Sequence, residues 1–396
     1  MNVLQVIPTY LPAWRHGGPA LAVHGLSRAL AAAGHRISVF TTNLHGDTFL
    51  EVEPDAPIDR DGVEVRYFPV PRPRRLCSSP AMKRALVAGV DAFDVLHLHS
   101  VFLAFTSSAA RIAEQAGKPY VLAPRGMLVP ELLRSRGRLR KSLWLRAVER
   151  RTIERASAIH VTTELEATDL GRMALDLPPI HVVPNGVDVD ALLADRSMAP
   201  SEAIASAIAA GPYFLFLGRI SWKKGLDRLI SWIAGLEGAR LLIAGNDEER
   251  LQPSLEQQAR ERGAADRIRF CGAVHGADRA ALLAGALALV LPSHSENFGN
   301  VVIEAMALGA PVVVTPEVGL AATVADEGAG LVVAGEAEAW TGALTRLICD
   351  TEARTAMGRR GLEAARRRFD WSRVAAAMVE VYDAAVSTAE AAPRRR

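Results

Sequence analysis

The sequence predicts an α/β protein built from two doubly wound parallel sheets. Short apolar runs alternate with longer segments of helical periodicity, which is typical of strand–helix–strand units. The alternation pauses in an Ala/Ser/Asp-rich stretch at 191–211 and then restarts. A chain of 396 residues suits two or three domains, and a hydrophobic content of 49% supplies each with a core.

The elements follow in order from these runs. A strand at 3–7 is followed by a helix at 19–33, whose leucines recur at helical spacing until Gly34. The other strands of the first series are expected at 37–41, 63–68, 95–99, 120–123, 158–162 and 181–183. Those of the second series are expected at 213–217, 240–244, 268–271, 288–291, 312–315 and 331–333. We therefore expect domains at 1–195 and 196–370, followed by a terminal helix at 371–390.

Composition limits the class of protein. The formal net charge of +2 gives no support for a nucleic-acid partner. Cys77, Cys271 and Cys349 form no CxxC pair, which fits a reducing compartment without structural zinc. The start of the chain reads as a strand rather than a signal peptide, and the longest apolar run, 280–291, is too short to span a membrane. We expect a cytoplasmic protein, free or attached to the inner membrane face.

Two glutamates lie eight positions apart in the stretch SHSENFGNVVIEAMALGAP at 293–311. Glu296 stands among polar residues before Gly299, whereas Glu304 lies about one turn inside an apolar helical pattern. Because an unpaired buried carboxylate is costly, Glu304 needs a partner, and the hydroxyl groups of a ligand would serve. A partly exposed helix glutamate is the alternative reading.

A glycine and two cations follow the strand in LFLGRISWKKG at 215–225. Gly218 lets the backbone approach a ligand, and Arg219 and Lys224 can meet phosphate oxygens. In a doubly wound domain this loop and the Glu296 segment share the sheet edge where ligands bind. A solvated basic loop is the alternative for this motif alone.

Together these residues resemble the donor site of retaining glycosyltransferases of family 4. The resemblance rests on GR at 218–219, KG at 224–225, the E-x7-E pair Glu296/Glu304 and the following EAMALGAPVV. It covers nearly the whole chain and is more specific in the C-terminal half. It implies the GT-B fold, in which two Rossmann-like domains face a central cleft. It also implies that the terminal helix crosses back onto the N-terminal domain.

The resemblance implies roles for the donor-site residues. Cleavage of a nucleotide-diphosphate sugar develops negative charge on the diphosphate, which we expect Arg219 and Lys224 to meet. Glu304 is expected at the ribose hydroxyls and Glu296 at the sugar ring. Gly218 completes the nucleotide site in the loop after its strand.

The start of the helix that holds Glu304 adds to this site. There Gly299 and Asn300 would present backbone N–H groups and the positive end of the helix dipole. Some transferases neutralise the diphosphate with a divalent metal, but this chain has no Asp-x-Asp suitably placed at a strand end: the one at 188–190 lies in a turn toward the linker. We therefore expect no metal and no cofactor.

The N-terminal half offers weaker signals. Gly17-Gly18 lies in a loop that enters a helix, where it could cradle a phosphate or simply form a tight turn. His97 and His99 share one face of a strand end; they could be structural or a metal pair, although no third ligand is evident. The resemblance favours His99 near the reacting sugar.

Three further residues follow strands on the same edge. Arg125 and Glu164 are candidate acceptor contacts, with a structural ion pair as the alternative for Arg125, and Asn185 is a weaker candidate. The segment 134–155 holds nine basic and two acidic residues. It is either a solvated helix face or a surface for anionic lipid or a lipid-diphosphate acceptor.

These observations favour a retaining, metal-independent glycosyltransferase. It would move a hexose-type sugar from a nucleotide-diphosphate sugar to a saccharide or lipid-linked acceptor, in surface polysaccharide biosynthesis. A GT-B nucleotide-sugar epimerase and a non-catalytic nucleotide-sugar binding protein are the alternatives. The base and the sugar stay open among GDP-mannose, UDP-glucose, UDP-galactose and UDP-N-acetylhexosamines.

Overall fold

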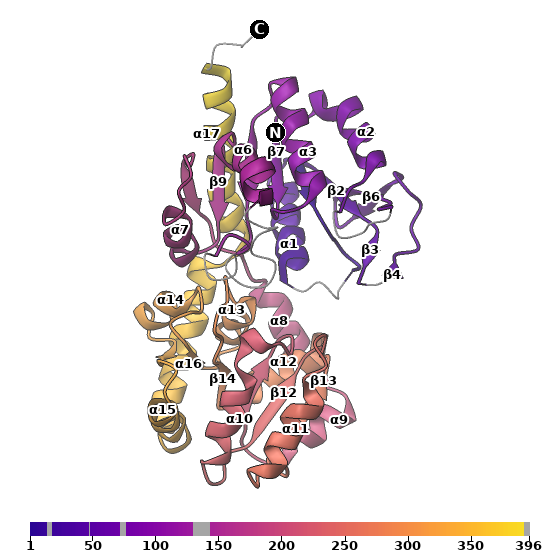
Figure 1. Ribbon diagram of the computed structural model, residues 1–396. Helices are drawn as coiled ribbons and strands as arrows, with labels where there is room; N and C mark the ends of the chain where they lie inside the picture. The colour runs from indigo at the N-terminus through magenta and orange to yellow at the C-terminus, as the bar shows by residue number, and fades with distance from the viewer. Residues whose placement is uncertain (14–17, 47, 72–76, 130–142, 392–396) are drawn as a thin grey trace. The chain divides into compact units, whose positions relative to one another are not determined.

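The computed structural model describes residues 1–13, 18–46, 48–71, 77–129 and 143–391, which form two compact units (Figure 1). Unit 1 consists of Met1–Gly186 together with Trp371–Arg396, and unit 2 of Val187–Asp370. The division precedes the expected boundary at 195/196, because helix α8 (Val189–Arg196) packs on α12 (Gly276–Gly285) of unit 2.

Unit 1 contains a doubly wound sheet with strand order β10-β9-β8-β7-β1-β2-β6-β5. Its strands are β1 (Asn2–Ile7), β2 (Arg36–Thr42), β5 (Pro57–Arg60), β6 (Val63–Phe68), β7 (Val95–His99), β8 (Tyr120–Ala123), β9 (Ala158–Val161) and β10 (Ile180–Val182). Its α-helices are α1 (Gly18–Ala32), α2 (Pro80–Gly89), α3 (Ala104–Ala116), α6 (Arg150–Glu154), α7 (Glu164–Gly171) and α17 (Trp371–Ala391). The described residues of unit 1 also form a 3₁₀ turn (Val90–Ala92) and a π-helical turn (Leu145–Glu149).

Alternate residues of each strand enter two separate cores. Leu4 and Val6 of β1 pack in the core that includes residues of α2 and α3, whereas Val3 and Ile7 pack in the core that includes residues of α1 and α17. The sequence therefore reads as continuous apolar runs, because both faces of the sheet are buried.

One edge of this sheet was not predicted from the sequence. Strand β5 pairs antiparallel with β6 through a hairpin at Asp61–Gly62, where both residues have positive φ (57° and 81°). An Asp-Gly pair between two strands is the usual signal for such a turn. The short antiparallel pair β3 (Leu44–His45) and β4 (Thr48–Phe49) was also not predicted.

Unit 2 contains a parallel sheet of six strands in the order β13-β12-β11-β14-β15-β16. They are β11 (Phe214–Leu217), β12 (Leu241–Ala244), β13 (Ile268–Gly272), β14 (Ala288–Leu291), β15 (Val312–Val314) and β16 (Gly330–Val332). Besides α8 and α12, the helices are α9 (Glu202–Ala209), α10 (Leu226–Ala234), α11 (Gln252–Glu261), α13 (Asn300–Ala307), α14 (Ala321–Asp326), α15 (Ala337–Cys349) and α16 (Thr351–Arg368); a 3₁₀ turn spans Trp222–Lys224. The fold class predicted from the sequence is confirmed.

The last helix belongs to the first unit. Helix α17, drawn in yellow in Figure 1, packs on α1, β7 and β8 of unit 1. Its first residue, Trp371, lies against two glycines: a Cβ built on Gly25 would lie 2.3 Å from the indole, and one built on Gly186 would lie 2.4 Å from it. Only residues without a side chain leave room for this ring.

Gly25→Ala should therefore destabilise unit 1. The added methyl group must displace a large ring, and such overpacking costs roughly 1–3 kcal/mol. Gly89→Ala is the control, because Gly89 is likewise a helical glycine of unit 1, the last residue of α2, but has nothing within 4 Å of a built Cβ. Thermal unfolding should show a lower melting temperature for Gly25→Ala alone. Equal melting of both variants would contradict the contact.

Candidate functional site

The donor motifs of unit 2 lie where its strand order reverses. In the order β13-β12-β11-β14-β15-β16, the chain runs outward in opposite directions from β11 and β14. The loop with Gly218–Gly225 follows β11, and the segment with Glu296–Asn300 follows β14. Ligands of open α/β sheets bind at the carboxyl ends of strands at such a switch point.

Backbone contacts hold the two loops together. The backbone N–H of His294 donates to the carbonyl of Lys223 at 2.7 Å. Gly225 adopts a positive φ of 65°, and a Cβ there would lie 2.3 Å from the carbonyl oxygen of Pro292. A side chain at Gly225 would therefore push the β11 loop away from β14.

This approach brings two predicted site residues into contact. The ammonium of Lys224 donates to Oε2 of Glu296, and the two side chains are 14% and 21% exposed. The backbone of Glu296 is held in turn, because its N–H donates to Glu317 at 3.1 Å and its carbonyl accepts from Gly319 at 2.8 Å. The carboxylate and the cation thus occupy fixed, partly buried positions at the switch point.

Glu304 has a partner that the sequence analysis did not foresee. The guanidinium of Arg279, on α12, donates to Oε2 of Glu304 on α13. The carboxylate was expected to need a partner, and the structure supplies an arginine from the neighbouring helix α12. Its assignment to ribose hydroxyls stays a prediction.

The other predicted donor residues lie around this pair. Arg219 is half exposed and pairs with Glu248 at 3.3 Å. Gly218 has a φ of 153°, and a Cβ there would lie 3.9 Å from Nζ of Lys224. Gly299, with a φ of 90°, immediately precedes α13, whose first residue is Asn300.

Unit 1 has its own switch point, between β1 and β7. Gly18 begins α1 after β1, whereas Gly17 lies outside the described residues. His99 ends β7, and Arg125 follows β8. Positive φ values at Ser100 (72°) and Arg125 (57°) mark both strand ends; such strain in residues other than glycine is concentrated at functional sites.

His99 and Arg125 contact each other. Nε and Nη2 of Arg125 lie 3.3 and 3.2 Å from Nδ1 of His99, and Nη1 donates to Asn185 at 3.1 Å. His99 is fully buried, whereas Arg125 is partly exposed. Burial lowers the pKa of Arg125 to about 10, against the opposing effect of Glu166. Arg125 therefore keeps its charge at neutral pH.

A row of buried polar side chains continues from His99 under α17. Gln5 of β1 pairs in register with His97 of β7, and alternation places both on the face that α17 covers. Gln5 lies 2.6 Å from Nε2 of His99 and 3.1 Å from the Tyr382 hydroxyl, which lies 2.8 Å from Nδ1 of His97.

The row ends at β9. Nε2 of His97 lies 3.2 Å from Nδ1 of His160, and Nε2 of His160 lies 2.8 Å from the carbonyl oxygen of Val183. Burial, reinforced by neighbouring positive charge, lowers the pKa of His97 and His99 well below the usual value and that of His160 to about 3. All three histidines are therefore neutral.

Glu164 does not join this row. It is exposed in the first turn of α7. Two residues later, Glu166 is buried and accepts from the backbone of Gly126 at 2.6 Å and of Thr162 at 2.9 Å, which fixes the loop after β8.

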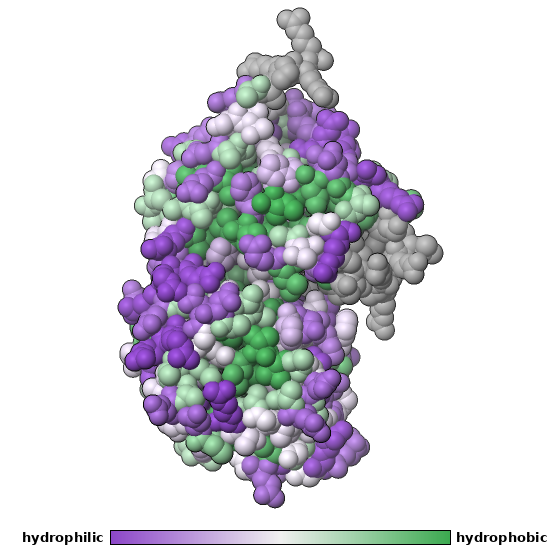
Figure 2. Space-filling view, turned by 90° about the vertical axis from the view of Figure 1, so that its left-hand side faces the viewer, coloured by the Kyte–Doolittle hydropathy of each residue, from purple (hydrophilic) through white to green (hydrophobic). Residues whose placement is uncertain are grey.

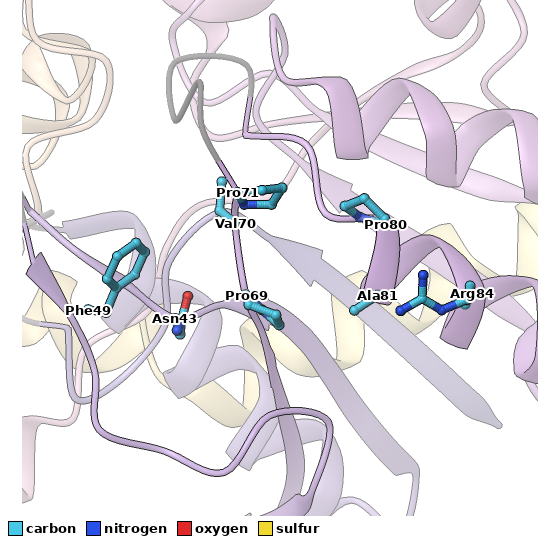
Figure 3. Close-up of a pocket in the computed structure, with 8 residues that line it drawn as sticks. All are labelled: Asn43, Phe49, Pro69, Val70, Pro71, Pro80, Ala81 and Arg84. Carbon is cyan, nitrogen blue, oxygen red and sulfur yellow. The ribbon is translucent and has the colours of Figure 1, made fainter.

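A hollow of unit 1 lies beyond β2 and β6. Its walls are mainly apolar, with Phe49 on one side and Pro80 and Ala81 of α2 on the other (Figure 3). Asn43 and Arg84 are the polar side chains that line it. None of the site residues predicted from the sequence contributes to its wall.

The basic segment 134–155 is only partly described, since 130–142 lie outside the described residues. In the described part Leu143 is 70% exposed, and Arg150 and Arg151 pair with Glu154 and Glu114. Contact with a membrane stays a prediction.

Among the described helices none is long and apolar enough to cross a membrane, and the face in Figure 2 mixes hydrophilic and apolar side chains. In the same residues no three His, Cys, Asp or Glu side chains could hold a metal ion together.

Comparison with known proteins decides the family. The model of glycosyl transferases group 1 matches residues 203–364, and the glycosyl transferase 4-like domain matches residues 17–186. A D-inositol 3-phosphate glycosyltransferase of Xylanimonas cellulosilytica is 31% identical over 393 residues, which cover 92% of this chain and 91% of the relative. The chain belongs to the GT-B glycosyltransferases of family 4 type.

Other relatives of this glycosyltransferase agree. A phosphatidyl-myo-inositol mannosyltransferase of Mycobacterium leprae is 32% identical, with 93% of each chain covered. Sucrose-phosphate synthase from Thermosynechococcus elongatus has a similar fold, with a TM-score of 0.78 at 23% identity over 98% of this chain and 99% of that one. HepE of Anabaena, in complex with UDP and glucose, also has a similar fold. Its TM-score is 0.76 at 20% identity, over 97% of this chain and 99% of that one.

Sequence reasoning missed several residues of the glycosyltransferase that complete these clusters. Gln5, His160 and Tyr382 join the polar row, and Arg279 pairs with Glu304. A signal existed for Gln5 and His160, because each is a polar residue inside an otherwise apolar strand. Tyr382 and Arg279 carry no such signal, since both lie on helices with polar faces.

The buried histidines predict that the glycosyltransferase loses stability in mild acid. The unfolded chain binds a proton at each histidine below about pH 6.5. The folded His97, His99 and His160 stay neutral far below that pH. Between these limits each should remove about 1.4 kcal/mol of stability per pH unit as pH falls.

Urea unfolding of unit 1 at pH 7.5, 6.5 and 5.5 would measure this slope. His160→Gln should reduce the slope by about one histidine's share. A free energy of unfolding that stays constant between pH 6.5 and 5.5 would contradict the neutral row.

Proposed function

We propose that this glycosyltransferase transfers a hexose-type sugar from a nucleotide-diphosphate sugar, with retention of anomeric configuration and without a metal. The observation that carries the proposal is the fixed Lys224–Glu296 pair at the switch point of unit 2. A phosphate-binding cation and a carboxylate for sugar hydroxyls stand in contact there, so one ligand that carries both groups would meet them together.

Lys224 and Arg219 would stabilise the negative charge that develops on the leaving group. When the bond between the anomeric carbon and the diphosphate oxygen breaks, the electron pair stays on the diphosphate. Lys224 is positioned to stabilise that charge. Arg219 can join after leaving Glu248, because a surface ion pair of this kind is worth only about 0–1 kcal/mol.

The remaining donor contacts follow the same logic. Glu304 would accept hydrogen bonds from the ribose hydroxyls, in exchange for part of its contact with Arg279. The start of α13 at Gly299–Asn300 would face the phosphates with its positive dipole end. Gly218 leaves room for the backbone to approach.

In the proposed reaction the acceptor hydroxyl oxygen bonds to the anomeric carbon on the face that the diphosphate leaves. Its proton passes to a phosphate oxygen of the leaving group, so no protein nucleophile is required. The His99–Arg125 pair of unit 1 would serve the acceptor side.

Two of the relatives are named for a phosphorylated inositol, D-inositol 3-phosphate in one and phosphatidyl-myo-inositol in the other. A saccharide or lipid-linked acceptor that bears a phosphate would suit a cation such as Arg125 here. A role in surface polysaccharide assembly is compatible with such an acceptor.

A panel of nucleotide sugars tests the donor. The true donor should raise the melting temperature, since a ligand at a hundred times its Kd adds about 2.7 kcal/mol of stability. Turnover with acceptor present, followed by NMR of the product anomer, tests transfer with retention. Conversion of the donor sugar in the absence of any acceptor would indicate epimerisation instead.

Lys224→Ala should lower kcat by on the order of 10²-fold, because its charge is needed most in the transition state. Arg219→Ala should act in the same direction. Lys223→Ala is the matched control, since Lys223 is the neighbouring lysine and its backbone carbonyl, which the substitution keeps, links the loops. Steady-state kinetics with saturating acceptor would measure these effects. If Lys224→Ala changed KM alone, the lysine would stabilise the bound substrate and the transition state equally, which would contradict its proposed role.

Activity should survive EDTA. Lys224, Arg219 and the start of α13 supply the positive charge that other transferases obtain from a divalent cation. The test compares initial rates in excess EDTA with rates in added magnesium or manganese. Complete loss in EDTA with recovery on adding metal would refute the proposed role of the cations.

A further inference from the structure

His99 is poorly placed to touch a substrate directly. Its ring is fully buried, and both of its nitrogens are hydrogen-bonded within unit 1. Arg125 is its neighbour at the end of β8, partly exposed and held in a strained backbone conformation. The substrate-facing member of this pair is therefore the guanidinium of Arg125, with His99 behind it.

We propose that Arg125 contacts the substrate and that Tyr382 of the terminal helix is a positioning residue for it, acting through Gln5 and His99. The inference rests on the proposed function, because it assigns the acceptor-side contact of that reaction. Tyr382, on the terminal helix α17, would thereby control the orientation of Arg125 at the end of β8.

The polarity of the hydrogen bonds carries this proposal. A guanidinium can only donate, so Nδ1 of His99 must accept from Arg125 and the proton of His99 lies on Nε2. That N–H donates to Oε1 of Gln5 at 2.6 Å. The amide nitrogen of Gln5 then donates to the Tyr382 hydroxyl oxygen at 3.1 Å.

The opposite end of the row leads to the same residue. The carbonyl of Val183 can only accept, so the proton of His160 lies on Nε2 and its Nδ1 accepts from His97. His97 therefore holds its proton on Nε2, and its Nδ1 accepts from the Tyr382 hydroxyl at 2.8 Å. Both ends thus require Tyr382 to accept from Gln5 and donate to His97.

These hydrogen-bond directions fix both the tautomer and the neutral state of His99. Six links in a row run in one direction from Arg125 to Val183, and a proton added to His99 would point at the guanidinium. Loss of the Tyr382 hydroxyl removes the acceptor of the Gln5 amide. The amide could then turn over and present its NH₂ group to His99, which would move the imidazole proton to Nδ1. Arg125 would keep Asn185 as an acceptor but lose His99, the acceptor that orients its Nε and Nη2.

The test compares Tyr382→Phe with Tyr120→Phe. Tyr120 is a buried tyrosine of the same unit, and its hydroxyl donates to the carbonyl of Thr152 at 2.8 Å, outside the row. Ring nitrogen shifts of ¹⁵N-histidine-labelled protein report the tautomer of His99. Steady-state kinetics report kcat and the KM of donor and acceptor.

In the wild type, His99 should carry its proton on Nε2. In Tyr382→Phe it should move wholly or partly to Nδ1, and kcat should fall about tenfold, the lower end of the effect of removing the hydrogen-bond partner that orients a metal-ligating histidine. The KM of the donor should not change, and Tyr120→Phe should behave as the wild type. Retention of the Nε2 proton in Tyr382→Phe, or a kcat within twofold of that of Tyr120→Phe, would overturn the proposal.

A second variant keeps the test decisive if Tyr382→Phe folds poorly. Gln5→Glu retains the acceptor for His99 but supplies a negative charge, which favours a protonated His99. Its kcat should fall as pH decreases, with a midpoint that the wild type lacks, because the new proton faces Arg125. Identical pH profiles would count against the inference. If the wild type transfers no sugar at all, the proposed function fails, whereas the tautomer shifts still decide whether Tyr382 sets His99.

Discussion

A polar atom buried inside a parallel sheet must find its hydrogen-bond partner within the protein. In unit 1 that constraint applies to Gln5, His97 and His160, all on the face of the sheet that α17 covers. They satisfy one another only with the Tyr382 hydroxyl between them. The last helix is therefore a necessary part of the N-terminal core. Gly25 and Gly186 act together with this requirement, because their missing side chains admit Trp371 at the start of the same helix.

Much of the fold could be predicted because both sheets are buried on two faces and their strands read as apolar runs. The expected strands at 63–68, 95–99, 120–123 and 288–291 coincide with β6, β7, β8 and β14, and the other expected strands differ by one residue at one or both ends. The β5 edge escaped notice because its alternating residues, Pro57–Arg60, are partly exposed and carry no apolar run. The boundary was misplaced because α8 resembles a linker in composition, although it packs in unit 2.

The site was only partly predictable for a different reason. Local motifs identify residues that share a loop, so Arg219, Lys224 and Glu296 could be named from their own segments. Partners from distant segments leave no such trace. Glu304 and Arg279 lie on successive helices, and nothing in the spacing of 25 residues shows that they meet. His99 was predicted near the reacting sugar, whereas its complete burial and its hydrogen bond with Gln5 could be seen only in the structure.

The two units solve the problem of positioning charge in different ways. In unit 2 each carboxylate of the predicted donor site already contacts a cation, Glu296 with Lys224 and Glu304 with Arg279. A ligand that binds there must exchange partners with these pairs, which favours a ligand that offers both negative charge and hydroxyl donors over one that offers either alone. In unit 1 Arg125 is held by neutral acceptors, His99 and Asn185, and its charge is not cancelled by direct contact with them. Its charge is therefore more available to an anionic group than that of Lys224. Under the proposed function, unit 2 would therefore hold the more selective donor site and unit 1 the more permissive acceptor contact.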